Sequence, residues 1–169
     1  MYPVWNFWKT IAVVAMLFVA ASLSYAKALT VTLSGNAVNF PMTAGSVNNP
    51  GSTSITATTV CGGCVFRTVN VYAYFNNAAS ALTQAGFNIP SSAFQISNNG
   101  SAFQALTNTV PFGGAGAGIQ LSSFFVFFGP FGSTHNDAMN FNIDLSGGIL
   151  PSLPPGTYVG TLTIQAQAP

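Results

Sequence analysis

The sequence predicts an all-β protein, folded as one antiparallel β-sandwich of about eight strands. Two observations lead to this fold class: short segments alternate apolar and polar residues with a period of two, and turn residues (Gly, Pro, Asn, Ser) separate these segments at regular intervals. A third is that no long segment has the 3.6-residue period of an amphipathic helix. Short strands at this spacing are typical of a sandwich of immunoglobulin-like topology, with a small barrel as the alternative.

The amino terminus has the pattern of a secretory signal peptide. Lys9 gives a basic start, residues 11–23 are a continuous apolar run, and the small residues of SYAKA follow. The run is shorter than the roughly 20 residues of a membrane span. We expect a signal-peptide helix that is cleaved after Ala28, or after Ala26, and a mature domain of residues 29–169. Because the sequence shows no lipid-attachment cysteine or anchor signal, the mature domain should be secreted or at the cell surface, with no membrane contact.

Residues 64–75 illustrate the strand pattern most clearly. Val69, Val71, Ala73 and Phe75 fall on one face, and polar residues and two tyrosines fall on the other, as in a strand with one buried face. Other strands are expected at residues 28–33, 36–40, 53–61, 119–128, 139–145 and 157–167. Residues 76–86 are expected to form a short helical turn.

A hairpin is expected in the repeat SAFQISNNGSAFQAL, residues 92–106. Asn99 and Gly100 suit a two-residue turn, which would place Ile96 opposite Phe103. One side of this hairpin would then be apolar and the other side would carry amide groups.

Cys61 and Cys64 are the only cysteines, and two glycines separate them. An oxidising compartment favours a disulfide between them. Gly-Gly suits the two-residue turn of a β-hairpin, and residues flanking such a turn lie about 5.5 Å apart, within disulfide range. We therefore expect a disulfide that staples a hairpin of residues 53–61 and 64–75.

The cysteine pair has two alternative functions. A redox centre usually lies at a helix start, where the dipole lowers the thiol pKa, whereas these neighbours are strand formers. A zinc site needs four ligands, and His135, Asp137 and Asp144 are distant in sequence and lack ligand spacing. We expect no metal or other cofactor.

Very few charges remain after the leader is removed. Arg67, Asp137 and Asp144 are the charged residues of the 29–169 domain, so its net charge is one minus two, or −1. Such a surface has no basic region for nucleic acid or anionic lipid. Charge repulsion between copies is also weak, which permits self-association.

The residues needed for catalysis are also scarce. Asp137 and Asp144 would lie up to about 23 Å apart in an extended chain, whereas glycosidase carboxylates lie within about 10 Å. His135 and Asp137 are not accompanied by the G-x-S-x-G motif of serine hydrolases. We expect no catalytic residues, and interpret His135 as a polar loop residue and the glycine-rich residues 112–120 as a flexible surface loop.

Two segments resemble a family of exported bacterial proteins. The stretch FPMTAGSVNNPGSTSITATTVC and the later LPPGTYVGTLTIQAQ are similar to the β-sandwich proteins of the spore coat U and pilin-like group. In that group a Gly/Pro turn leads into a Ser/Thr-rich strand, and a Pro-x-Gly-Thr-Tyr segment opens the closing strand. The chain departs from it in two places: its cysteines flank one turn, and Ala168 replaces the penultimate tyrosine of chaperone-usher pilins. The resemblance implies a structural or adhesive role in a coat, fibre or pilus-like assembly.

The segment IQLSSFFVFFGPFG contains the first candidate binding surface. Phe125 and Phe127 fall on one face of the expected strand, and its other face is apolar as well. Either a long loop of the same chain covers the second face, or Phe125 and Phe127, with Phe131, form a patch for self-association. In the second case another copy, another surface protein or a donated strand such as residues 28–33 would cover the patch.

Tyr72 and Tyr74 form the second candidate surface. They share one face of their strand and could stack against a sugar. This surface is the basis of the alternative function, a secreted ligand-binding or carbohydrate-binding module.

Overall fold

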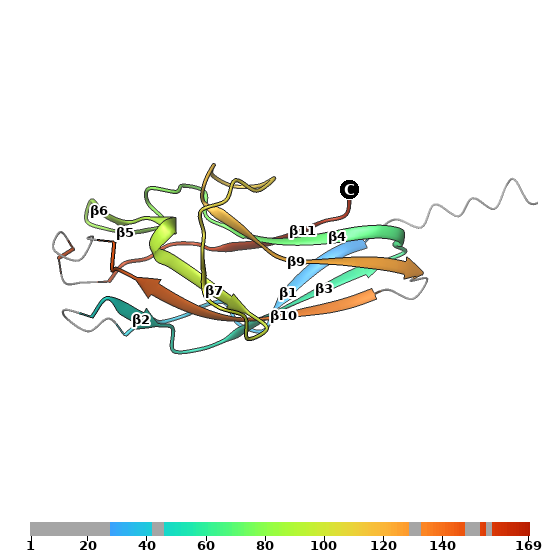
Figure 1. Cartoon of the computed structure of the whole chain (residues 1–169), viewed down its shortest axis with the longest axis horizontal. Coiled ribbons are helices and arrows are strands. Elements are labelled where there is room, and N and C mark those ends of the chain that lie inside the picture. The colour runs from blue at the N-terminus through green and yellow to red at the C-terminus, as the bar shows by residue number, and fades with distance from the viewer. Residues whose placement is uncertain (1–27, 42–45, 129–132, 148–152, 155–156) are drawn as a thin grey trace, which may run out of the picture.

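Two antiparallel sheets face each other in the structure, a computed structural model that describes residues 28–41, 46–128, 133–147, 153–154 and 157–169 (Figure 1). The expected all-β fold is confirmed, and the two facing sheets are those of a β-sandwich. The expected signal peptide lies outside the described residues, except for its last residue, Ala28. Phe131 also lies outside them.

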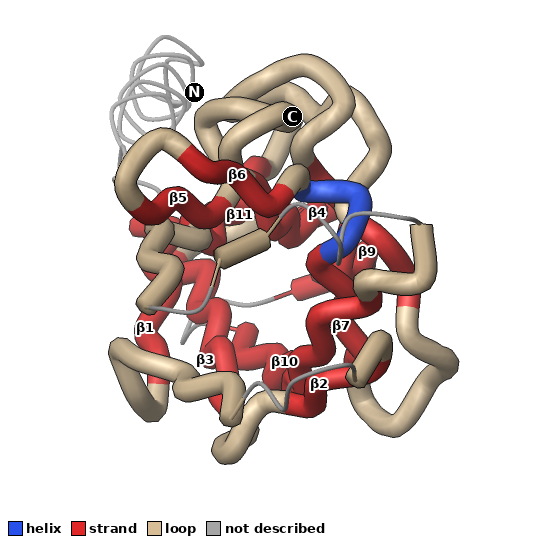
Figure 2. The backbone as a smooth tube through the Cα atoms, turned by 90° about the vertical axis from the view of Figure 1, so that its left-hand side faces the viewer, coloured by secondary structure: helices blue, strands red, loops and turns tan. Residues whose placement is uncertain are grey.

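The larger sheet has the strand order β1-β3-β10-β7-β8, with β2 also paired to β10, and the smaller sheet has the order β11-β4-β9. Figure 2 shows these layers end-on, with the β5–β6 hairpin beside the smaller sheet. The strands are β1 (Ala28–Leu33), β2 (Asn48–Pro50), β3 (Ile55–Gly62), β4 (Val65–Tyr74), β5 (Leu82–Gln84), β6 (Phe87–Ile89), β7 (Phe94–Asn98), β8 (Gln104–Ala105), β9 (Gly118–Phe128), β10 (Ser133–Asp144) and β11 (Thr163–Gln167), and Ser91–Ala93 form a short 3-10 helix.

The core lies between the two sheets and follows the period-two pattern. In β4, the side chains of Val69, Val71 and Ala73 are fully buried, as the alternation predicts. Aromatic rings fill the centre: Phe94 packs edge-on against Phe75, with the ring centroids 5.1 Å apart. Burial of these apolar side chains is the main force that holds the two sheets together.

The prediction that β3 and β4 pair with each other as a hairpin is wrong. β3 pairs with β1 and β10 in the larger sheet, whereas β4 pairs with β9 and β11 in the smaller one. The Gly62–Gly63 turn therefore crosses from sheet to sheet, and Gly63 adopts a φ of 68° that favours glycine. The disulfide Cys61–Cys64 spans this crossing, with its Cα atoms 5.7 Å apart and both residues fully buried.

Several expected elements differ in the structure. Residues 76–86 do not form a helical turn; they lead into the β5–β6 hairpin, whose turn residues Ala85 and Gly86 both have positive φ. Residues 36–40 form a loop, in which Val38 and Phe40 pack on the core. The last strand begins at Thr163, later than expected.

The hairpin of residues 92–106 is present, but its expected register is off by one residue. Asn99 and Gly100 have positive φ and form the expected turn, yet Ile96 lies opposite Gln104 instead of Phe103. The strand that follows the turn holds one extra residue before β8, as in a β-bulge. Consequently Phe103 is exposed, while Leu106 is fully buried.

The buried disulfide should stabilise the crossing between the sheets. Replacing both cysteines by alanine is expected to lower the free energy of unfolding by about 2 kcal/mol, by the loop-entropy relation applied to this short loop. Denaturant unfolding of the two proteins measures the difference. Freshly purified protein should also have no titratable thiol under denaturing conditions, and two reactive thiols would contradict the disulfide.

Candidate functional site

Three exposed phenylalanines form an aromatic patch on the outer face of the smaller sheet. Phe66 is 60% exposed, Phe125 59% and Phe127 67%. The rings of Phe66 and Phe127 meet edge-on, with centroids 4.8 Å apart. We call Phe66, Phe125 and Phe127 the aromatic patch.

The alternation of β9 explains why two of these rings face outward. Val126 points inward, is 3% exposed, and packs with the disulfide and Val69. Phe125 and Phe127 must then point outward, because neighbouring side chains of a strand lie on opposite faces. A register shift farther back in β9 leaves Leu121 as an extra residue, so that Leu121 and Ser122 both contact the interior.

β9 is also the edge strand of the smaller sheet. Within the described ranges it forms a ladder with β4 alone. Its other edge is contacted near its start, where Asn108 bridges Gly118 and the Asn98 side chain donates to the Leu121 carbonyl oxygen. Among the described residues no strand pairs with the edge beside the aromatic patch, and such an open apolar edge is a template for pairing with another strand.

The two segments that could have covered the patch lie elsewhere. β1 pairs with β3 along its whole length, so residues 28–33 belong to the larger sheet of their own chain. The long loop before β9 crosses the opposite end of the smaller sheet, where Phe112 lies 6.0 Å from both Tyr72 and Tyr74.

Because that loop covers Tyr72 and Tyr74, the structure does not support the sugar-stacking role expected of them. Tyr72 and Tyr74 are each only 8% exposed, so neither ring offers an open stacking surface. The Tyr74 hydroxyl donates to Gln165 Oε1 at 2.8 Å. The loop is also not a free surface loop: a Cβ on Gly113, whose φ is 75°, would collide with the Tyr74 ring.

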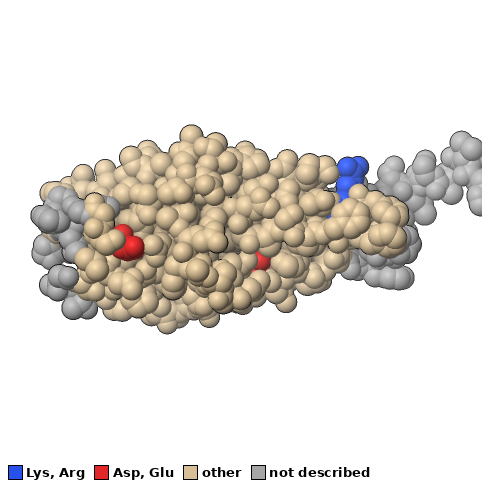
Figure 3. Space-filling view, in the orientation of Figure 1, with Lys and Arg blue, Asp and Glu red and all other residues tan. Residues whose placement is uncertain are grey.

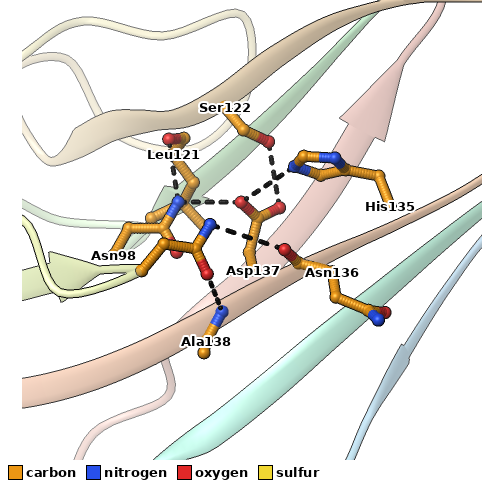
Figure 4. A network of polar contacts seen from close by, with 8 residues as sticks. Asn98, Leu121, Ser122, His135, Asn136, Asp137 and Ala138 are labelled. Atoms are coloured by element: carbon orange, nitrogen blue, oxygen red, sulfur yellow. Dashed lines mark hydrogen bonds and ion pairs between the residues drawn. The ribbon is translucent and has the colours of Figure 1, made fainter.

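A buried carboxylate lies between the sheets (Figure 4). Asp137 of β10 is fully buried, and its oxygens accept hydrogen bonds from Asn98 Nδ2 at 2.7 Å and from the Ser122 hydroxyl at 2.9 Å. His135 Nε2 lies 3.3 Å from the same carboxylate. Since Asn98 belongs to β7 and Ser122 to β9, this network joins the two sheets.

His135 is a strand residue rather than the expected loop residue. Its imidazole stacks on Phe124 with ring centroids 4.4 Å apart, and its side chain is 31% exposed. β10 turns the polar residues His135 and Asp137 inward. For this reason the apolar alternation did not predict the first half of this strand. Asp137 and Asp144 lie on opposite faces of this strand, because their separation in sequence is odd. This geometry places them on opposite sides of the sheet rather than around one substrate.

Few charged side chains lie on the face of the molecule that Figure 3 shows. The charged residues of the described part are Arg67, Asp137 and Asp144. Arg67 lies at the patch end of β4 and donates to the Pro169 carbonyl oxygen at 3.2 Å. Among the described residues there is no group of three His, Cys, Asp or Glu side chains placed to hold a metal ion, and no helix long and apolar enough to cross a membrane.

No protein-family model matches this chain, and no curated protein matches it. The candidate site is therefore defined by its geometry: an aromatic patch, an open strand edge, and little charge around them.

Loss of the buried carboxylate should destabilise the fold. Asp137→Ala is expected to lower the free energy of unfolding by about 3 kcal/mol, because it removes the acceptor of the Ser122 hydroxyl and one of the two acceptors of the Asn98 amide. Asn136→Ala, at an exposed neighbouring position, is the control and should change stability by less than about 0.5 kcal/mol. Equal stability of wild type and Asp137→Ala in denaturant unfolding would contradict a structural role for the network.

Asp144 should make stability depend on acid pH. Hydrogen bonds from the Ser146 side chain and backbone, and then from Gln95, hold the pKa of Asp144 below its ordinary value. The carboxylate therefore contributes stability above its unfolded pKa of about 3.9, and this is lost as the pH falls through the lower folded pKa. Thermal unfolding should find Asp144→Asn less stable than wild type at neutral pH, with the difference shrinking below pH 4. A difference that stays constant down to pH 2 would contradict this assignment.

Proposed function

We propose that this protein is an exported structural or adhesive surface protein, a coat, fibre or pilus-like component without catalytic activity, and that its copies associate through the aromatic patch. The observation that carries the proposal is the exposure of Phe125 and Phe127 on the edge strand β9, together with Phe66 on the neighbouring strand β4. Large exposed apolar groups that lie together usually mark an interaction site.

Burial of these rings can drive association. Each phenylalanine contributes up to roughly 1.5 to 3 kcal/mol when it passes from full exposure to full burial. The three phenylalanines of the patch are about 60% exposed in the single chain, so burying each of them against another copy would contribute a sizeable part of this free energy. Pairing of the open β9 edge with a second β9 would add backbone hydrogen bonds and fix the orientation of the copies.

The charge distribution favours a second copy as the partner. Among the described residues, Arg67 is the charged side chain at this end of β4, and it already has the Pro169 carbonyl oxygen as an acceptor. Two copies would therefore meet without a set of like charges, and a strongly acidic or basic partner would find no complementary surface.

The immunoglobulin-like, pilin-like topology and the export of the mature domain are part of the same proposal. Consecutive long strands change sheet, from β3 to β4 and from β9 to β10, and this alternation supports such a topology. The buried disulfide supports an oxidising compartment. The carbohydrate-binding alternative has less support, since Phe112 covers the two tyrosines on which it depends.

Removing the two exposed rings of β9 should give a folded monomer. We expect wild-type protein to sediment as dimers or larger species at micromolar concentration, and Phe125→Ser with Phe127→Ser to sediment as a monomer with an unchanged circular-dichroism spectrum. The fold should tolerate both changes because these side chains are 59% and 67% exposed.

Phe87→Ser with Phe103→Ser is the matched control. Both of these phenylalanines are 45% exposed and lie outside the patch, so this variant should associate like wild type. A monomeric wild type, or a control variant that dissociates as fully as the patch variant, would refute association through the patch.

A further inference from the structure

A cavity of about 570 Å³ lies between the two sheets, at the end opposite the aromatic patch. β4 connects the two regions: Phe66 at its start belongs to the patch, and Phe75, just after its end, lines the cavity. The cavity is therefore distinct from the proposed site of self-association.

Incomplete pairing near β11 leaves this space between the sheets. β11 begins at Thr163, and the residues before it, from Thr157 to Leu162, have one strand-like contact in the described part, a bridge between Val159 and Thr83. Tyr158 is turned toward Pro154, and its hydroxyl donates a hydrogen bond to the Pro154 carbonyl oxygen at 3.1 Å. In the described part of the chain, no strand pairing joins this segment to the loop after β1.

The lining has an apolar floor and an uncharged polar rim. Core residues of both sheets form the floor, among them Phe75, Phe94, Met139 and Phe141. Exposed amide and hydroxyl side chains lie at the rim: Asn36, Asn39, Thr157 and Thr161. Among the described residues that line it, none is Asp, Glu, Lys, Arg or His.

We propose that this cavity binds a neutral amphiphile with one alkyl chain and an uncharged polar head, of which a monoacylglycerol is the simplest example. Its volume lies within the roughly 300–1,000 Å³ of small-molecule sites, which are mostly apolar with a few orienting polar groups. An alkyl chain would supply the van der Waals contacts that an unfilled apolar space lacks. The rim can hydrogen-bond hydroxyl groups, whereas a carboxylate would enter a site that has no cation to pair with it.

The test uses the neutral fluorophore N-phenyl-1-naphthylamine with the purified protein. Its fluorescence should rise saturably on binding, and monolaurin should displace it. Laurate, which has the same alkyl chain and is ionised at pH 8, should compete at least about tenfold more weakly, a difference of about 1.4 kcal/mol. Absence of saturable fluorescence, or equal competition by monolaurin and laurate, would overturn the proposal.

Two glycine variants locate the binding. A Cβ on Gly35 would lie 3.7 Å from Ile55 Cγ1, an ordinary contact directed at the cavity lining, so Gly35→Phe should fill the space and abolish displaceable binding. Gly147→Phe is the control, since a Cβ there meets nothing within 4 Å and Gly147 is not part of the lining. Retained binding in Gly35→Phe, or loss in Gly147→Phe, would contradict the assignment.

A charge-gain variant keeps the test decisive even if Gly35→Phe fails to fold. Ala37 is exposed and lines the cavity, so Ala37→Lys should place a cation at the rim and bring laurate to at least the affinity of monolaurin. An unchanged preference for monolaurin would refute the site. The patch variant Phe125→Ser with Phe127→Ser should bind the fluorophore like wild type; loss of binding there would place the probe on the patch instead.

Discussion

One strand, β9, constrains the rest of the structure: in the described part of the chain it pairs with a single neighbour, and it carries apolar side chains on both faces. Its inner face is fixed, because Val126 packs on the disulfide at the sheet crossing. Its outer face, with Phe125 and Phe127, is left to the solvent. A strand cannot bury both faces in a two-layer fold unless something covers the second one. That constraint makes the patch an intrinsic consequence of the way the chain folds.

The hydrogen bonds of the buried Asp137 hold β9 in place against the larger sheet. In the described part of the chain the core consists of two apolar clusters, one around Phe94 and Phe141 and the other around the disulfide. Asp137 accepts from Asn98 of β7 and Ser122 of β9, so the network ties the edge strand to the larger sheet. A buried charge of this kind needs such partners to be tolerated. We infer that a rigid strand, rather than a loop, displays the aromatic rings.

Alternation in the sequence was sufficient to predict the buried face of β4 and the apolar outer face of β9, because a period of two is a local property. Strand partners are not local, and here the prediction was wrong: Gly62 and Gly63 suit a hairpin turn as well as a crossing between sheets. Polar residues that point inward, such as His135 and Asp137, concealed half of β10. The covering of Tyr72 and Tyr74 by Phe112, and the cavity, depend on tertiary packing that no short segment encodes.

Hydrogen exchange of the β9 backbone at low and high micromolar concentration tests whether copies associate through this strand. If copies associate through this strand, amides in residues 122–128 should become more protected as concentration rises, while amides of β1 and of the β5–β6 hairpin should stay unchanged. Protection of β9 that does not depend on concentration, or a concentration effect confined to other strands, would contradict association through β9.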